Sequence, residues 1–195
     1  MSTLLPAELA WYVTGRFYRK SDQSLADYGY FIHLAGIAAP MFNGAPGEST
    51  AHFTFAATPF VATGLVNGTL SLALDPVGEF SIYLQRKPKG NFNSPESFAQ
   101  GECIATFRRI SIAVGTTVAE GAGKQAQALF SSNVFTARLI DSAPFALAGA
   151  TYDLRQMLGH GVTQFGTAAA TPINPPPALY DLVIAFSGSA IALGG

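Results

Sequence analysis

Charged side chains are scarce in this sequence. Lysine and arginine number 11 and aspartate and glutamate 12 among 195 residues, so 12% of the chain is charged and the net charge is −1. A typical soluble domain carries about 25% charged residues. A near-neutral chain offers no basic surface for phosphate backbones, which argues against nucleic acid as a partner. The sparse charge instead predicts a surface partly covered by other copies in a homo-oligomer.

Cysteine and long apolar runs are nearly absent as well. Cys103 is the single cysteine, which excludes an intrachain disulfide framework. No window reaches the roughly 18 uninterrupted apolar residues of a membrane-spanning helix, and the first residues lack the basic and apolar regions of a signal peptide. We therefore expect no membrane insertion and, by default, a cytoplasmic location.

Histidine is equally rare, and its three copies form no metal-binding pattern. His33, His52 and His160 lie in distant segments, and none has a histidine or cysteine two or four positions away. We expect neither a metal nor a cofactor. These histidines are the remaining candidates for acid–base catalysis, because the chain has no nucleophile motif and no paired-carboxylate spacing. Whether the protein is an enzyme is left open.

What the sequence does contain is a succession of alternating apolar segments, such as "EFSIYLQ" and "ECIATFRR", separated by glycine and proline. This pattern predicts one all-β domain over residues 1–195, an antiparallel β-barrel or barrel-like sandwich of about 8–10 strands. A chain of this length can bury one sizeable core. In its pattern the chain resembles small antiparallel barrels such as the lipocalins, the allene-oxide-cyclase barrels and the dirigent barrels, a resemblance of architecture that no motif carries.

One part of the sequence permits a register to be predicted. The turn "DPVG" at 75–78 would close a hairpin in which Leu72 lies opposite Ile82. The strand "ECIATFRR" would then pair back onto the second strand of that hairpin, with Phe80 opposite Phe107. The result would be a three-stranded antiparallel meander.

The two faces of this expected meander differ. One face is apolar and places Cys103 opposite Leu84, where a thiol behaves as a small hydrophobic group. The other face carries hydroxyl, phenol and amide groups but almost no charge, which is unusual for a solvated face. A mildly polar barrel lumen, or a sheet face covered by another subunit, would explain it. The ligand-binding residues expected on this face and in the adjoining loop are Ser81, Tyr83, Gln85, Thr106, Phe92 and Phe98.

Two long segments separate expected strands. The loop at 86–101 contains "SPES", which predicts a short helical turn with Pro95 at its first position, and it is expected to be a lid over the barrel mouth, an arm toward a neighbour, or a solvated loop. The proline-rich segment 171–177 predicts an extended path. It is a second candidate for an arm that contacts another subunit.

Two functions remain open from the sequence. The first is a self-associating structural subunit with extensive subunit contacts, which the low charge favours. The alternative is a β-barrel that binds a small apolar ligand, including a cyclase or isomerase that acts by shaping the ligand in its lumen.

Overall fold

The computed structural model describes residues 3–22, 24–57, 64–67, 70–73, 78–111, 113–120, 127–169 and 171–194. The elements are β1 (Leu9–Arg19), β2 (Leu25–Leu34), β3 (Phe53–Ala57), β4 (Gly64–Asn67), β5 (Leu70–Ala73), β6 (Glu79–Leu84), the 3-10 helix η1 (Pro95–Ala99), β7 (Glu102–Arg109), β8 (Ala113–Glu120), β9 (Gln127–Ser142), β10 (Phe145–Leu147), β11 (Ala150–Tyr152), α1 (Leu154–Leu158), β12 (Gly161–Ala168) and β13 (Leu182–Ala192). No helix among these residues is long and apolar enough to cross a membrane.

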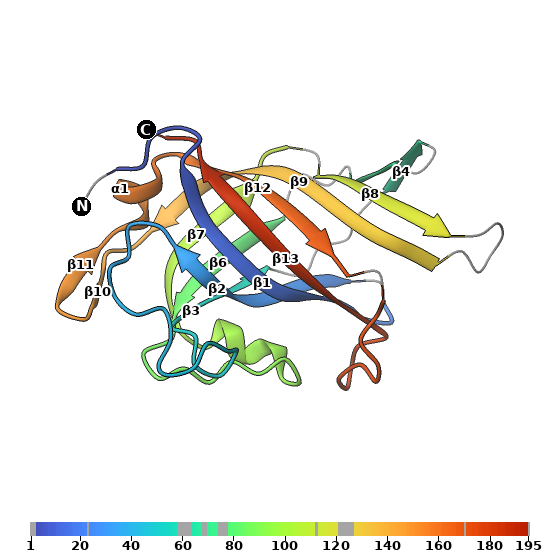
Figure 1. Cartoon of the computed structure of the whole chain (residues 1–195), viewed down its shortest axis with the longest axis horizontal. Coiled ribbons are helices and arrows are strands. Elements are labelled where there is room, and N and C mark those ends of the chain that lie inside the picture. Colours follow the sequence, from blue (N-terminus) through green and yellow to red (C-terminus); the bar gives the residue numbers. More distant parts are fainter. Residues whose placement is uncertain are drawn as a thin grey trace.

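Eight of the strands close into an antiparallel barrel. They follow one another in the order β12-β13-β1-β2-β3-β6-β7-β9, and β9 pairs with β12 to complete the ring. Figure 1 shows these strands winding obliquely around a common axis. Closure removes the exposed strand edges that an open sheet would leave. The all-β barrel expected from the sequence is confirmed.

The interior of the barrel is packed with aromatic rings. Trp11 on β1 lies edge-on to Phe107 on β7, with ring centroids 5.6 Å apart, and to Phe80 on β6, at 6.5 Å. Strands β2 and β3 separate β1 from β6 in the sheet, so these contacts cross the lumen. The Trp11 indole Nε1 donates a hydrogen bond to Gln164 Oε1 on β12 at 3.0 Å. Alternate residues that share the face of Trp11 therefore point inward.

One end of the barrel is closed by the short helix α1. Leu154, Met157 and Leu158 are fully buried and belong to the same apolar core as Trp11. The Asp153 side chain caps the helix by accepting a hydrogen bond from the backbone N–H of Arg155 at 2.9 Å. The first and last described stretches lie near this helix, because the backbone N–H of Leu4 donates to the Met157 carbonyl oxygen and the Gly194 carbonyl oxygen accepts from the backbone N–H of His160.

The sheet continues beyond the barrel as a four-stranded extension. β9 pairs with β8 from Gln127 to Val134, β8 pairs with β5, and β5 pairs with β4. The order of the extension strands, β4-β5-β8-β9, parallels the order of the barrel strands, β3-β6-β7-β9. β4 therefore corresponds to β3, β5 to β6 and β8 to β7, and each of these pairs is consecutive in the sequence. Figure 1 shows this extension, formed by β4, β5, β8 and residues 127–134, projecting from the barrel.

The hairpin expected between the segments around Leu72 and Ile82 is wrong. Leu72 on β5 lies opposite Val114 of β8, and Ile82 on β6 lies opposite Phe55 of β3. Residues 74–77, which hold most of the expected turn, lie outside the described residues. Alternation in a strand shows which of its faces is apolar, but it does not identify the partner strand, because several strands have the same alternating pattern.

The expected register between β6 and β7 is confirmed at Phe80 and Phe107, which lie opposite each other, and it changes after Ile82. A bulge there pairs Tyr83 with Cys103 and leaves Ile104 as the extra residue. Cys103 is consequently exposed, whereas the uninterrupted register had placed it on the apolar face.

Candidate functional site

Three of the expected ligand-binding residues lie on the outer wall of the barrel. On β6 the neighbouring residues Phe80 and Ile82 belong to the interior core, so the side chains between them point outward. Ser81 Oγ and Thr106 Oγ1 form a hydrogen bond of 2.9 Å across β6 and β7. Tyr83, the next residue of the same face, is only partly buried. The apolar face, and not this one, fills the lumen.

Gln85 is the buried member of the same face, with 2% of its surface exposed. Its amide Nε2 donates to the backbone carbonyl oxygens of Ser97 at 3.0 Å and Phe98 at 3.3 Å. The Thr54 hydroxyl donates to the same Phe98 oxygen at 2.6 Å. Gln85 and Thr54 thus fix η1 against the outside of the barrel.

The 86–101 loop is therefore a cover for the outer wall. Phe92 and Phe98 are 8% and 0% exposed, and they pack into a second apolar cluster with Tyr18, Tyr180 and Val183. The Tyr18 hydroxyl donates to the Phe92 carbonyl oxygen at 2.8 Å. The helical turn expected at "SPES" is η1. The loop packs against its own chain rather than over the barrel mouth.

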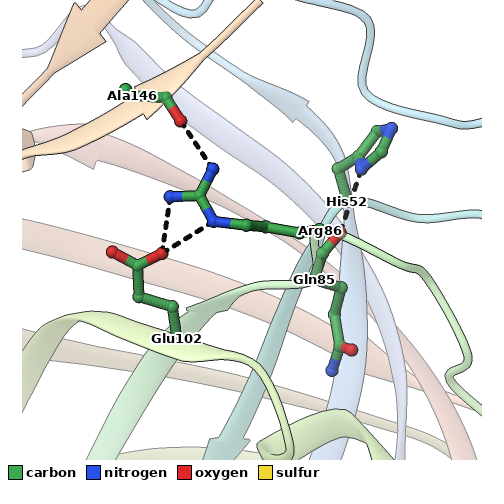
Figure 2. A network of polar contacts seen from close by, with 5 residues as sticks. All are labelled: His52, Gln85, Arg86, Glu102 and Ala146. Atoms are coloured by element: carbon green, nitrogen blue, oxygen red, sulfur yellow. Dashed lines mark hydrogen bonds and ion pairs between the residues drawn. The ribbon is translucent and has the colours of Figure 1, made fainter.

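Arg86 joins the two ends of this loop. Its Nη2 and Nε donate to Glu102 Oε2 at 2.7 and 3.2 Å, and its Nη1 donates to the Ala146 carbonyl oxygen at 2.9 Å. Figure 2 shows the Gln85 side chain pointing away from this network, while its carbonyl oxygen lies 3.0 Å from His52 Nδ1. The Arg86 and Glu102 side chains are 54% and 42% exposed, so the pair acts as a weak surface clamp.

Two tyrosines in the second cluster have perturbed pKa values. Burial raises the pKa of Tyr18. Burial also raises the pKa of Tyr180, whose hydroxyl donates to Glu96 Oε1 at 2.9 Å. A phenol with a raised pKa stays protonated near neutral pH and serves as a hydrogen-bond donor. These tyrosines hold the loop in place and are not bases.

The three histidines are not brought together. His33, the penultimate residue of β2, lies on the outer wall, where its ring is 6.3 Å from the Tyr12 ring. His52 precedes β3 beside the loop cover, and His160 donates its backbone N–H to Gly194 at the plugged end. Within the described ranges, no group of three or more His, Cys, Asp or Glu side chains could hold a metal ion.

An uncharged row of side chains crosses the outer wall on four adjacent strands. Tyr12 on β1 pairs with Ser189 on β13, Ser189 pairs with Phe165 on β12, and Phe165 pairs with Val134 on β9. Tyr12, Phe165 and Val134 are 48%, 43% and 36% exposed. Aligned apolar side chains of this size mark an interaction surface when they gather in one patch.

The small residues of β13 turn this row into a slot. A low floor between Tyr12 and Phe165 is formed by Ser187, Gly188 and Ser189. Because β13 lies between β1 and β12, the backbones of these two strands are separated by twice the distance between neighbouring strands, about 9.6 Å. We call Tyr12, Phe165 and this floor the aromatic slot. The slot belongs to an open hollow of about 550 Å³ lined by Tyr12, Ser132, Asn133, Val134, Phe165, Gly166, Thr167, Ser187, Gly188 and Ser189.

The lining of the slot is electrically neutral. None of the described residues around the hollow is charged. The Ser187 hydroxyl donates to the Val13 carbonyl oxygen at 3.1 Å. The slot therefore offers aromatic rings and hydroxyl groups but no acid or base. Its chemistry is suited to binding rather than to catalysis.

The slot could not be found from the sequence, because its walls lie at opposite ends of the chain. Tyr12 stands in "AWYVTGRF" and Phe165 in "VTQFG", and they become neighbours only when β12 and β1 both pair with β13. The one available signal was the position of Tyr12 on the face opposite Trp11. No family model, curated protein or solved structure matches this chain, so the slot's geometry carries the functional argument.

Proposed function

We propose that this protein is a self-associating subunit and that the aromatic slot forms the centre of the contact between copies. The exposed row that includes Tyr12 and Phe165 is the observation that carries this proposal. Two neutral slots can meet without the cost of removing water from a charged group. Aromatic side chains surrounded by polar ones are typical of the residues that dominate interface energies.

The dimensions of the slot fit a further aromatic ring. A ring inserted midway between Tyr12 and Phe165 would lie about 4.8 Å from each, within the range of roughly 4.5–7 Å for aromatic pairs. Phe165 itself projects from the outer wall. A two-fold arrangement can therefore insert the Phe165 of each copy into the slot of the other. Such a contact uses the same residues on both partners.

The extension supports association independently of the slot. Its four strand segments contain a single charged residue, Glu120. A closed barrel encloses an interior for its apolar residues, but a sheet that continues beyond the barrel encloses none. A second copy that covers the extension would account for the low charge of this part of the chain.

Replacing Phe165 tests the proposal. Sedimentation of the wild-type protein between about 1 and 100 μM should show oligomers with an even number of subunits. Phe165→Arg introduces a charge into the apolar contact and should weaken association by at least about a hundredfold. Ile110→Arg is the matched control, because Ile110 is 48% exposed and lies away from the slot.

Two results would contradict the proposal. The first is a wild-type protein that remains monomeric at the highest concentration. The second is a Phe165→Arg variant that keeps the wild-type mass and the wild-type dissociation constant. Circular dichroism of each variant verifies that the barrel is intact.

A further inference from the structure

The inward side chains of the barrel are less buried at the end opposite α1. On β1 the inward residues Trp11 and Val13 are 1% and 2% exposed, whereas Phe17 is partly exposed. On β13 the inward residue Ala190 is 0% exposed, whereas Ile184 is partly exposed. We call the end of the lumen at Phe17 and Ile184 the barrel mouth.

An ion pair lies inside the barrel at this mouth. Arg109 Nη2 on β7 donates to Asp27 Oδ2 on β2 at 3.2 Å. Strands β3 and β6 stand between β2 and β7, so the pair spans the lumen. Asp27 pairs in the sheet with Phe17, and Phe17 pairs with Ile184, which places the carboxylate in the layer of the mouth.

The pair is far more buried than the other ion pairs of the described residues. The Arg109 and Asp27 side chains are 10% and 17% exposed, against 32–54% for the side chains of the other three pairs. The Phe135 ring lies 4.8 Å from the guanidinium carbon of Arg109. Burial raises the pKa of Asp27 although Arg109 opposes the shift. Enclosed charges of this kind add little net stability, and they concentrate at functional sites.

The chemistry of the pair selects the headgroup of a ligand. Among the described residues the two charges compensate each other, and a charged headgroup would add a further charge to an enclosed site. Carboxylate oxygens accept hydrogen bonds and guanidinium N–H groups donate them. An uncharged group that both donates and accepts can bond to each member of the pair. The partly exposed side chains of Phe17, Ile184 and Phe186 offer an apolar wall beside it.

We infer that the barrel mouth binds a small amphiphile whose apolar chain or ring packs against Phe17 and Ile184. Its uncharged donor–acceptor headgroup, an alcohol or a carboxamide, lies at Asp27 and Arg109. This site is on the inner face of β1 and β13, whereas the aromatic slot is on their outer face. Ligand binding is therefore a function separate from self-association.

The neutral fluorescent probe N-phenyl-1-naphthylamine tests the site in the wild-type protein. We expect a saturable rise in its fluorescence, reversed by octanamide at a concentration at least about tenfold lower than by octanoate or octylammonium. The three competitors have the same number of carbon atoms and differ in headgroup charge. The absence of saturable binding would overturn the inference, as would equal or better displacement by either ion.

A pair of variants on one strand locates the probe. Ile184→Trp places a large ring in the mouth and should weaken probe binding at least about tenfold. Ala185→Trp carries the same ring to the outer face of β13 and should leave binding unchanged, and Phe165→Arg should also leave it unchanged. Equal loss in Ala185→Trp or Phe165→Arg would overturn the inference. If Ile184→Trp does not fold, the competition series in the wild-type protein decides.

Discussion

Two inward-facing glycines, Gly15 on β1 and Gly29 opposite it on β2, make room for the aromatic interior. A Cβ atom at Gly15 would lie 2.6 Å from the Tyr28 carbonyl oxygen and 2.9 Å from the rings of Phe55 and Phe186. The backbone oxygen cannot move without disturbing the pairing of β1 with β2. Close-packed interiors respond to even one added methyl group.

Gly15→Ala should accordingly lower the free energy of unfolding by about 1–3 kcal/mol, through overpacking. Urea unfolding followed by tryptophan fluorescence measures the change, since Trp11 is the only tryptophan and lies in the core. Gly47→Ala is the control, because its nearest atom would be Thr50 Oγ1 at 3.9 Å. A Gly15→Ala variant as stable as Gly47→Ala would contradict the proposed packing.

The buried ion pair gives a second prediction, which concerns pH. Arg109→Met leaves the Asp27 carboxylate enclosed without its cation and should destabilise the fold by about 3–5 kcal/mol at pH 7. Burial already raises the pKa of Asp27 in the folded state. A carboxyl group whose pKa is higher in the folded than in the unfolded state stabilises the fold at low pH. This contribution is lost as the pH rises through the folded-state pKa. The penalty should therefore shrink as pH falls from 7 toward the ordinary aspartate range near 4.

Urea unfolding of the wild type and Arg109→Met at pH 7 and pH 5 measures this difference. The double variant Asp27→Leu with Arg109→Met removes both charges and should recover most of the lost stability at pH 7. An Arg109→Met penalty that is the same at both pH values would show that the Asp27 carboxylate is not enclosed as described.

Among the elements, η1 and its loop show how polar groups can position an apolar cover. The Gln85 amide bonds to the carbonyl oxygens of Ser97 and Phe98 inside a buried junction. Phe98 is fully buried beside them. A buried amide that meets its partners orients a segment, because misplacement would leave those partners unsatisfied.

Gln85→Leu should loosen this cover by removing the side-chain donor to the Ser97 carbonyl oxygen. We expect a loss of about 1–3 kcal/mol in unfolding free energy, and faster tryptic cleavage after Lys89, which is exposed near the start of the loop and precedes a glycine. Gln100→Leu, a substitution at an exposed position of the same loop, is the control. Cleavage at equal rates in both variants would argue against the role assigned to Gln85.

The proline-rich segment belongs to the same layer of the molecule. The backbone N–H of Ile173 donates to Val183 on β13 at 2.8 Å, and Ile173 packs against the second apolar cluster. Leu179, in contrast, is 79% exposed. The segment is thus anchored to its own barrel at Ile173, while Thr171, Pro172, Asn174 and Pro175 are exposed.

For the molecule as a whole, the neutral outer wall predicts how association depends on salt. Because no described residue lining the slot is charged, screening has no ion pair to weaken there. Raising sodium chloride from about 0.05 to 1 M should leave the dissociation constant within about threefold, or tighten it. Sedimentation at both salt concentrations measures it. Dissociation at high salt would instead indicate a contact held by charges outside the slot.

The sequence was informative where a property is local. Alternation of apolar residues identified the strands, the all-β class and the opposition of Phe80 to Phe107. The prolines and glycines marked the breaks, and "SPES" marked η1. Each of these depends on neighbouring residues, whose spacing follows from the repeat of a strand or a helical turn.

Closure of the barrel settled which distant strands meet, and alternation along the chain does not specify those pairings. β5 and β6 pair with different strands although their patterns match, and one bulge moves Cys103 to the outer face. The aromatic slot and the pair of Asp27 with Arg109 are assembled from strands distant in the chain. Alternation assigns a side chain to one of two faces, whereas the ring of strands decides which face is inside and what lies across it.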